Sequence, residues 1–480
     1  IHAYLMALLY VRSGRRVPEP PAKSPLLPVT IQLPVYNERY VIGRLLDAVT
    51  RLDYPRDLLE IQVLDDSTDD TALEASVLVS RLSARGWHAV HRHRRERTGY
   101  KGGALREGLA EARGSLVAIF DADFLPPPHF LRATVPYFQD PGIGMVQTRW
   151  THLNEGFSVL TRAQAAALDG HFLIEHAVRN RHGAFINFNG TAGIWRKECI
   201  LAAGDWQDDT LTEDLDLSYR AQLAGWKFLF VPHIECPAEL PAEVNGLKGQ
   251  QFRWAKGSAQ TALKILPRLA SARLPAFVRF QALVHLTNHL VYPLLLLLGF
   301  MALPALWILD RHPETGTLFS LATVLAVASF GHPWLYLVAQ RSQGRRFPEA
   351  CLMVAYVVAG NLGIALNNTR ALVEGLAGFQ SDFIRTPKYG LTSRADHWRG
   401  KAYHPPASLW PLLEIVFAAY GVAGLAYALG HGHWLAVPIL ILYVLGSGTL
   451  GALSMYNAWT RSREDRGGAP ALAPALPPGN

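Results

Sequence analysis

The sequence predicts an α/β doubly wound (Rossmann-like) domain followed by an α-helical transmembrane domain, and two observations carry this prediction. Between residues 29 and 123, short apolar runs alternate with helical stretches, which is typical of a parallel sheet covered on both faces. Nearly all long apolar runs lie after residue 280, although the mean hydropathy of the 480 residues is only +0.10. We therefore expect an N-terminal transmembrane remnant with a linker (1–28), the α/β domain (29–260), and interfacial and transmembrane helices (261–480).

The α/β domain should contain four parallel strands that end in polar residues. These strands are Val29–Leu33, Ile61–Leu64, a weaker His88–His91, and Leu116–Phe120. Ligands of doubly wound sheets bind beyond the carboxyl ends of the strands. Because each strand runs into polar residues, several segments should contribute to one site.

Two acidic pairs stand at these strand ends. Asp121 and Asp123 follow a nearly all-apolar strand, and their spacing directs both side chains to the same side. Carboxylate oxygens suit Mg²⁺ or Mn²⁺, and Asp65 and Asp66 end the second strand in the same manner. A solvated turn, or helix capping by the residues after Asp66, is the alternative. An acidic rim would hold a diphosphate only with a divalent cation, helped by Lys101 or an arginine.

Several other classes of protein are not supported. The sequence has neither the glycine pattern of a dinucleotide-binding fold nor that of a P-loop ATPase. The formal net charge of +7 comes without an aromatic and basic recognition module, so we expect no nucleic-acid partner and attribute the basic residues to membrane flanks. The three cysteines are far apart and form neither a metal pattern nor a disulfide framework.

Two later motifs extend the candidate site. Thr212-Glu213-Asp214 opens a helical pattern, and Asp214 is the candidate base for an acceptor hydroxyl. The helix dipole also favours carboxylates in a first turn, which is the structural alternative. Gln250-x-x-Arg253-Trp254 would suit a phosphate contact beside a sugar-stacking platform, or equally an anchor at a membrane interface.

In this order, the motifs resemble the processive glycosyltransferase family 2 enzymes, the cellulose synthase superfamily. The resemblance covers roughly residues 29 to 458. Gln32–Glu38, Gln62–Asp69, Phe120–Phe124 and Phe188–Gly193 are most similar to the cellulose synthase-like A and C groups, the mannan/glucomannan and glucan synthases. The resemblance implies a GT-A fold for the α/β domain.

The resemblance also implies residue roles. The expected donor contacts are Asp65, Asp66, Lys101, Asp121, Gln250 and Arg253, with Asp121 and Asp123 as metal ligands. Asp214 would be the general base in the motif that also holds Thr212 and Glu213, and the acceptor would contact Trp254, Asn189, Gly190 and Thr191. Phe383 and Thr386 match a gating loop of F-x-V-T type, from which Arg385 departs.

The implied activity is that of a membrane-embedded, inverting, metal-dependent hexosyltransferase. It would elongate a β-linked mannan, glucomannan or glucan from GDP-mannose or UDP-glucose, with the polymer and membrane lipids as partners. A glycolipid synthase that adds one or two sugars is the nearest alternative. A sugar-nucleotide-binding transporter or scaffold without chemistry is the alternative from another class.

A helix needs about 20 apolar residues to cross a bilayer. Four segments are long enough: 286–309, 317–339, 410–430 and 434–458. The positive-inside rule places the arginine-rich loops on both sides of 350–373 in the cytosol, so this segment should be interfacial and the loop 374–408 cytosolic. With a span truncated at Ile1–Val11, we expect five crossings and a cytosolic catalytic domain at the plasma or inner membrane. His285, Asn288 and His289 could line a channel or simply pack between helices.

Overall fold

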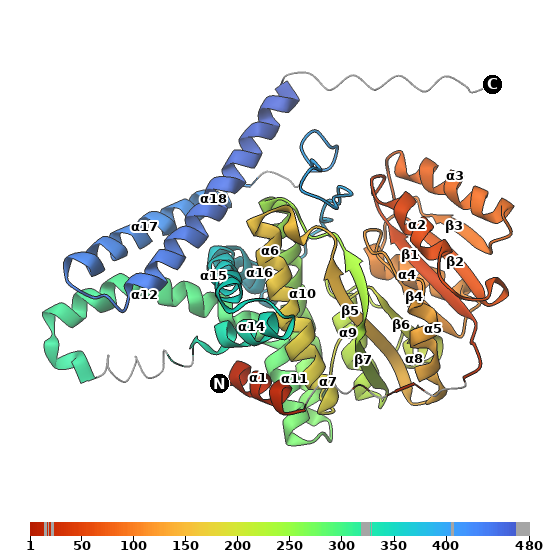
Figure 1. The fold of residues 1–480 in the computed structure, drawn as a ribbon, viewed down its shortest axis with the longest axis horizontal. Helices are drawn as coiled ribbons and strands as arrows, with labels where there is room; N and C mark the ends of the chain where they lie inside the picture. Colours follow the sequence, from red (N-terminus) through yellow and green to blue (C-terminus); the bar gives the residue numbers. More distant parts are fainter. Residues whose placement is uncertain are drawn as a thin grey trace.

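The computed structural model describes residues 1–13, 24–317, 329–404 and 408–466, together with residues 17, 19, 20 and 327. A sheet covered by helices forms one side of the molecule, and apolar helices project from the other (Figure 1). The strands are β1 (Val29–Val35), β2 (Leu59–Asp65), β3 (Ala89–His93), β4 (Leu116–Ile119), β5 (Ile143–His152), β6 (Gly193–Arg196) and β7 (Lys227–Ala238).

The seven strands form one mixed sheet in the order β3-β2-β1-β4-β6-β5-β7. The four predicted strands are confirmed as parallel neighbours, with β1 between β2 and β4. Their bounds shift: Asp65 is the last residue of β2 rather than the first after it, and β3 extends to His93. β6 pairs antiparallel with both β4 and β5, so it extends the sheet beyond the predicted strands.

Two layers of helices cover the sheet because its strands are apolar on both faces. The helices of this part are α2 (Ile42–Thr50), α3 (Thr71–Ala84), α4 (Tyr100–Glu111), α5 (Phe130–Thr134), α6 (Val159–Asp169), α7 (Ala177–Arg181), α8 (Lys197–Ala202), α9 (Glu213–Leu223), α10 (Val244–Ser271) and α11 (Ala276–Leu286). Side chains of α2, α3 and α5 pack with Ile31, Ile61 and Ala118 on one face, and those of α4, α8 and α9 pack with Val117 and Ile119 on the other.

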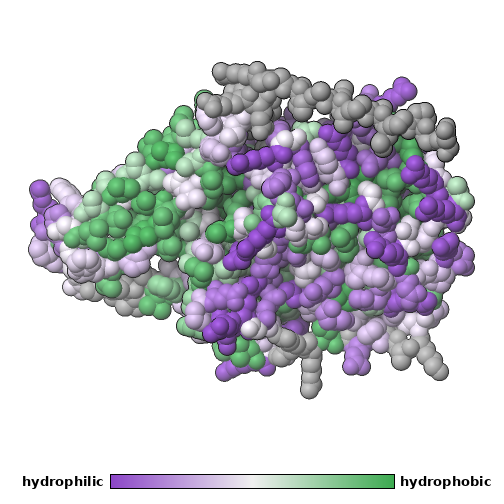
Figure 2. All heavy atoms as spheres, turned by 45° about the horizontal axis from the view of Figure 1, so that its top comes forward, coloured by the Kyte–Doolittle hydropathy of each residue, from purple (hydrophilic) through white to green (hydrophobic). Residues whose placement is uncertain are grey.

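The remaining helices include three that are long and apolar enough to cross a membrane, within the described residues: Asn288–Arg311, Trp410–Gly430 and Val437–Thr460. They correspond to three predicted spans and contain α12 (Val291–Arg311), α17 (Trp410–Gly430) and most of α18 (Val437–Arg466). Figure 2 shows that their surface is mainly hydrophobic, whereas the sheet side is largely hydrophilic. The chain is therefore a membrane protein. Residues 318–326 and 328 of the predicted span 317–339 lie outside the described residues, and α14 (Gly331–Ser342) covers its end.

The segment predicted to be interfacial forms two helices, α15 (Phe347–Gly363) and α16 (Ala365–Leu376), bent by 50° at their junction. Both ends of this pair contact the sheet side. Before α15, Gln343 Oε1 accepts a hydrogen bond of 2.7 Å from Arg149 of β5. After α16, Asp382 accepts one of 3.0 Å from the Tyr100 hydroxyl of α4. Both ends of the bent pair therefore contact the same side of the molecule, and that the segment does not cross the membrane stays a prediction.

The N-terminal segment forms α1 (His2–Ser13), which packs against α14 and the π-helical turn Gly170–His176. Ala3 and Met6 of α1 are buried there beside Leu335 and Ala339. Helices α15 and α18 also approach each other closely: a Cβ added at Gly446 would lie only 2.2 Å from the Ala359 carbonyl oxygen. Small residues permit such close approaches between apolar helices.

Candidate active site

A cleft lies at the carboxyl ends of β1, β2 and β4, where the doubly wound topology predicts ligand binding. Its wall combines residues from the sheet, from α9 and α10, and from the loop after α16. Every residue that the sequence placed at the site lines this cleft except Asp65 and Thr191. The lining includes Asp66, Lys101, Asp121, Asp123, Asn189, Gly190, Thr212, Glu213, Asp214, Gln250, Arg253, Trp254, Phe383 and Thr386.

Asp121 and Asp123 follow β4 and each pairs with a lysine. Lys101 Nζ donates hydrogen bonds to Asp121 Oδ1 at 2.5 Å and to the Gly190 carbonyl oxygen at 2.8 Å. Lys388 Nζ lies 2.7 Å from Asp123 Oδ2, which also accepts the backbone N–H of Glu239 at 3.1 Å. Carboxylate oxygens are the ligands that Mg²⁺ and Mn²⁺ prefer, so Asp121 and Asp123 fit such an ion, which would compete with the two lysines.

Asp214 stands in the first turn of α9, next to Gly190. Gly190 has φ +81°, and a Cβ there would lie 3.0 Å from Asp214 Oδ2, so the loop approaches the carboxylate closely. The backbone N–H of Leu215 donates to Asp214 Oδ1 at 2.8 Å and fixes the carboxylate. Burial, and then the neighbouring charge of Glu213, raises the pKa of Asp214 to about 7. A carboxylate with that pKa is suited to act as a base near neutral pH.

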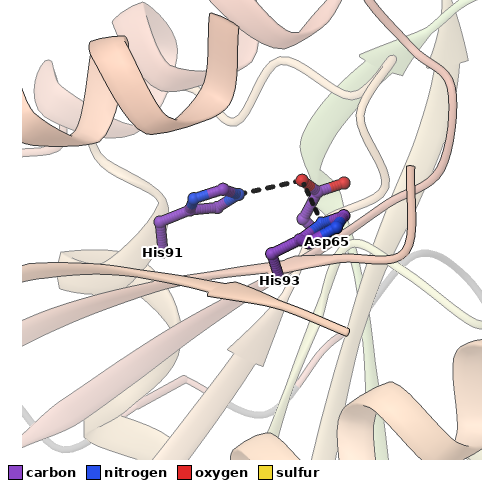
Figure 3. A group of neighbouring side chains, drawn as sticks. All are labelled: Asp65, His91 and His93. Carbon is purple, nitrogen blue, oxygen red and sulfur yellow. Dashed lines mark hydrogen bonds and ion pairs between the residues drawn. The ribbon is translucent and has the colours of Figure 1, made fainter. Parts of the chain in front are cut away.

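Asp66 faces the cleft, but Asp65 does not. Arg94 Nε and Nη2 each donate to an oxygen of Asp66 at 2.7 Å. The side chain of Asp65 is fully buried, and His91 and His93 are directed at its carboxylate (Figure 3). Burial alone would raise the pKa of Asp65, but hydrogen bonds from His91 and Ser67 lower it. The expected direct contact of Asp65 with the donor therefore needs correction, since in the described structure Asp66 occupies the wall of the cleft.

The predicted acceptor residues Asn189, Gly190 and Thr191 do not all line the cleft. Asn189 and Gly190 line the cleft, whereas Thr191 is fully buried. Thr191 Oγ1 accepts the backbone N–H of Asp121 at 2.8 Å, so Thr191 holds the backbone at the predicted metal ligand instead of lining the cleft.

The predicted gating loop lies over the cleft. Arg253 Nη2 donates to Thr386 Oγ1 at 2.8 Å, and the Arg253 guanidinium stands 4.7 Å from the centre of the Phe383 ring. Arg385, which departs from the loop pattern, donates to Glu38 Oε1 at 3.0 Å and to the Asn37 carbonyl oxygen. The unexpected arginine thus ties the loop to the end of β1.

A second cavity, which we call the chamber, adjoins the cleft. Asp214, Gln250, Trp254 and Asn189 line both spaces. From there the chamber extends among the apolar helices to Tyr292 of α12, Asn361 of α15 and Leu450 of α18. The three candidate channel residues His285, Asn288 and His289 also line it, and His285 Nδ1 lies 2.9 Å from the Tyr219 hydroxyl.

Comparison with known proteins now decides the family. Residues 27–257 match the family model described as "Glycosyltransferase like family 2". The glucomannan 4-β-mannosyltransferase 2 of Arabidopsis thaliana is 32% identical over 441 residues, which is 88% of this chain and 81% of that protein. The chain belongs to glycosyltransferase family 2. It is therefore a glycosyltransferase of the hexosyltransferase type, and the resemblance found in its motifs is confirmed.

Other relatives of this family 2 glycosyltransferase agree. The glucomannan 4-β-mannosyltransferase 1 of Cyamopsis tetragonoloba is 32% identical over 464 residues, covering 88% of this chain and 82% of its own. A mannosyltransferase from Pyrobaculum calidifontis, solved in complex with GDP-Man and Mn²⁺, superimposes with a TM-score of 0.52 at 22% identity, over 78% of this chain and 94% of that one. At that identity the likeness shows the fold alone, and it confirms the expected GT-A fold.

Several cleft residues of the family 2 glycosyltransferase were not singled out in the sequence. Glu38 and Glu239 line the cleft, and Arg97 stands 3.6 Å from the centre of the Tyr36 ring beside it. Burial raises the pKa of Glu38 to about 7, against the lowering effect of Arg385. Glu38 lay within a quoted motif, which was the available signal. Lys388 could not be predicted, because nothing in the local sequence links it to Asp123.

Proposed function

We propose that this glycosyltransferase transfers mannose from GDP-mannose to the end of a growing β-1,4-linked mannan or glucomannan at the cytosolic face of its membrane. The position of Asp214 carries the proposal, because this carboxylate lines both the cleft and the chamber. A donor in the cleft and an acceptor in the chamber would meet beside it. The choice of mannose is supported by relatives that are glucomannan 4-β-mannosyltransferases.

Asp214 would take the proton from the acceptor hydroxyl. Its pKa of about 7 keeps a large ionised fraction near neutral pH while leaving it basic enough to accept a proton. The freed oxygen forms a bond to the anomeric carbon as the bond from that carbon to the diphosphate breaks. One in-line displacement inverts the carbon, so an α-linked donor gives a β-linkage and GDP departs.

The departing diphosphate requires positive charge. Asp121 and Asp123 would hold a divalent ion, Mg²⁺ or Mn²⁺, which when bound neutralises charge on the leaving group. Lys101, Arg97 and Arg253 also line the cleft and supply cationic side chains for the phosphates. Phe383 and Thr386 would close over the donor, because Arg253 contacts both residues.

The acceptor would lie in the chamber, with Trp254 stacking on its terminal sugar. The chamber offers amide and imidazole groups suited to sugar hydroxyls, including Gln250, Asn361 and His289. Its extension between α12, α15 and α18 supports passage of the polymer into the membrane region. Arginines and lysines that flank the bent pair support a cytosolic position for the cleft.

The test is to incubate purified enzyme with labelled GDP-mannose, UDP-glucose or both, with Mg²⁺ or Mn²⁺, and to digest the products. We expect a long polymer from GDP-mannose that β-1,4-mannanase degrades, and none from an Asp214→Asn variant. Products of one or two sugars on lipid would instead identify a glycolipid synthase. Polymer from UDP-glucose alone would contradict the mannose assignment, and the absence of all transfer would contradict the enzyme proposal.

Passage through the membrane has its own test. In proteoliposomes with the catalytic side outward, newly made polymer should be protected from added mannanase until detergent is supplied. Polymer that is fully digested without detergent would contradict translocation while leaving the transfer reaction intact.

A further inference from the structure

Two imidazoles and a carboxylate converge at the edge of the sheet, outside the cleft wall. We propose that Asp65, His91 and His93 form a binding site for a divalent transition metal of the zinc class, separate from Asp121 and Asp123. The ligand atoms of the three residues all lie within 4.8 Å of one another. Imidazole nitrogen with a single carboxylate is a donor set that suits zinc rather than Mg²⁺.

The strand ladder creates this cluster. In the parallel pair β2–β3, Asp65 stands opposite His93, and Val63 stands opposite His91. Because side chains alternate along a strand, His91 and His93 point to the same face, where Asp65 also points. Figure 3 shows both rings directed at the one carboxylate. The arrangement is therefore held by regular backbone pairing rather than by a loop.

The distances are close to those of a metal site. Asp65 Oδ2 lies 2.9 Å from His91 Nε2 and 3.2 Å from His93 Nδ1. In a tetrahedral zinc site with bonds of about 2.0–2.2 Å, neighbouring ligand atoms lie roughly 3.3–3.5 Å apart. An outward movement of a few tenths of an ångström would thus admit an ion, and rotation of the histidine side chains provides it.

The groups around the cluster also fit. The backbone N–H of Ser67 donates to Asp65 Oδ1 at 2.8 Å, which orients the carboxylate and leaves Oδ2 for the ion. The Asp65 side chain is fully buried, that of His91 is 16% exposed and that of His93 is 40% exposed. The site is therefore rigid at its base and open on the His93 side, where an ion enters and a water completes four-fold coordination.

An ion at this place would join β2 to the edge strand β3 just before Arg94. Arg94 follows His93 in the chain and holds Asp66 in the wall of the cleft. Metal binding should therefore stabilise the part of the sheet that supports the nucleotide end of the cleft. If both histidines only donate hydrogen bonds to Asp65 and have a purely structural role, added metal should not stabilise the protein.

The experiment is a titration of the full-length, metal-stripped protein in detergent with Co²⁺, followed by visible absorption. An Asp121→Asn/Asp123→Asn background removes the other divalent site. We expect one equivalent of Co²⁺ to give the intense absorption of four-coordinate cobalt, and Zn²⁺ to abolish it by displacement. Zn²⁺ should also raise the melting temperature of this background by several degrees, because it binds the folded state.

Matched variants make the assignment specific. His91→Gln/His93→Gln should lose the four-coordinate spectrum and the stabilisation by Zn²⁺, whereas His233→Ala, which removes an exposed histidine of β7, should keep both. The single variant His93→Gln changes a partly exposed side chain and provides the same comparison if the double variant melts without a cooperative transition. A background protein without the four-coordinate spectrum, or a spectrum that survives in His93→Gln, would overturn the proposal.

Discussion

Lys388 Nζ lies 2.7 Å from Asp123 Oδ2, although 265 positions separate the two residues in the chain. The same ammonium group donates to the Glu239 carbonyl oxygen at 2.9 Å. Lys388 follows Thr386 of the predicted gating loop by two positions, so one segment carries both that loop and a cation at the proposed metal ligand. Any divalent ion at Asp123 must compete with this lysine.

Replacement of Lys388 should therefore strengthen the apparent binding of metal. In Lys388→Met, the Mn²⁺ concentration for half-maximal transfer should fall about threefold to tenfold, which corresponds to roughly 1 kcal/mol of competing charge. Lys197→Met is a suitable control, because Lys197 Nζ contacts the Ala112 carbonyl oxygen. Identical metal dependence in the two variants would show that Lys388 does not compete.

The raised pKa of Asp214 predicts the pH dependence of transfer. kcat/KM should rise with pH as the carboxylate ionises, with a midpoint near the pKa of about 7. In Asp214→Asn the rate should fall by about 10²–10⁴-fold at every pH. A profile that is flat between pH 5.5 and 8.5, with wild-type enzyme at saturating metal, would exclude Asp214 as the base.

The same shift predicts an effect on stability. The folded-state pKa of Asp214 lies above its unfolded value, so the folded protein binds more protons and the free energy of unfolding falls as pH rises between them. Asp214→Asn does not titrate and should melt several degrees above the wild type at pH 8 but near it at pH 5. An equal difference in melting temperature between variant and wild type at both pH values would contradict the claim that burial destabilises the ionised Asp214.

Gly190 should be required for activity through its approach to Asp214. Gly190→Ala should reduce transfer about 100-fold, because its Cβ would lie 3.0 Å from the Asp214 carboxylate in a left-handed conformation. Gly183→Ala is the matched control, since Gly183 also has a positive φ of +68° and has nothing within 4 Å of the added Cβ. Both variants should lose about 1 kcal/mol of stability, and comparable activities in the two would refute the steric argument.

Arg385 should stabilise the closed loop through Glu38. In Arg385→Val, which restores the F-x-V-T pattern, Glu38 loses a partner 3.0 Å away, and the KM for the donor should rise several-fold. Glu38→Gln in the same chain should recover part of the loss, with a coupling energy of about 1–3 kcal/mol in the double-mutant cycle. Additive effects of the two changes would mean that the pair does not dock the loop.

The first half of the sheet was predictable because each of its strands is apolar, continuous and followed by polar residues. β6 is only four residues long and pairs antiparallel with its neighbours, and β7 contains Pro232 and Pro237, which weaken a strand pattern. Their places depend on pairings between distant segments, and no local pattern records these. The candidate spans Asn288–Arg311, Trp410–Gly430 and Val437–Thr460 were predicted within a few residues, because composition and length alone define them.

At the site, motif residues were predicted but their orientations were not. Asp65 and Asp66 look alike in the sequence, yet alternation along β2 buries the first and turns the second into the cleft. Thr191 is likewise buried and accepts the backbone N–H of Asp121, whereas its neighbour Gly190 lines the cleft. The contact of Lys388 with Asp123 could not be predicted, because Lys388 reaches Asp123 only when the loop after α16 folds back over the sheet.

The central claim is that Asp214 deprotonates the acceptor while Asp121 and Asp123 hold the donor through a metal ion. Measuring donor binding and transfer separately tests this claim most directly. GDP-mannose affinity in the presence of Mn²⁺ should be measured by calorimetry, beside single-turnover transfer, for Asp214→Asn and Asp123→Asn. The account predicts that Asp214→Asn binds the donor with near wild-type affinity but fails to transfer, whereas Asp123→Asn loses metal-dependent binding. Transfer by Asp214→Asn at the wild-type rate would contradict it.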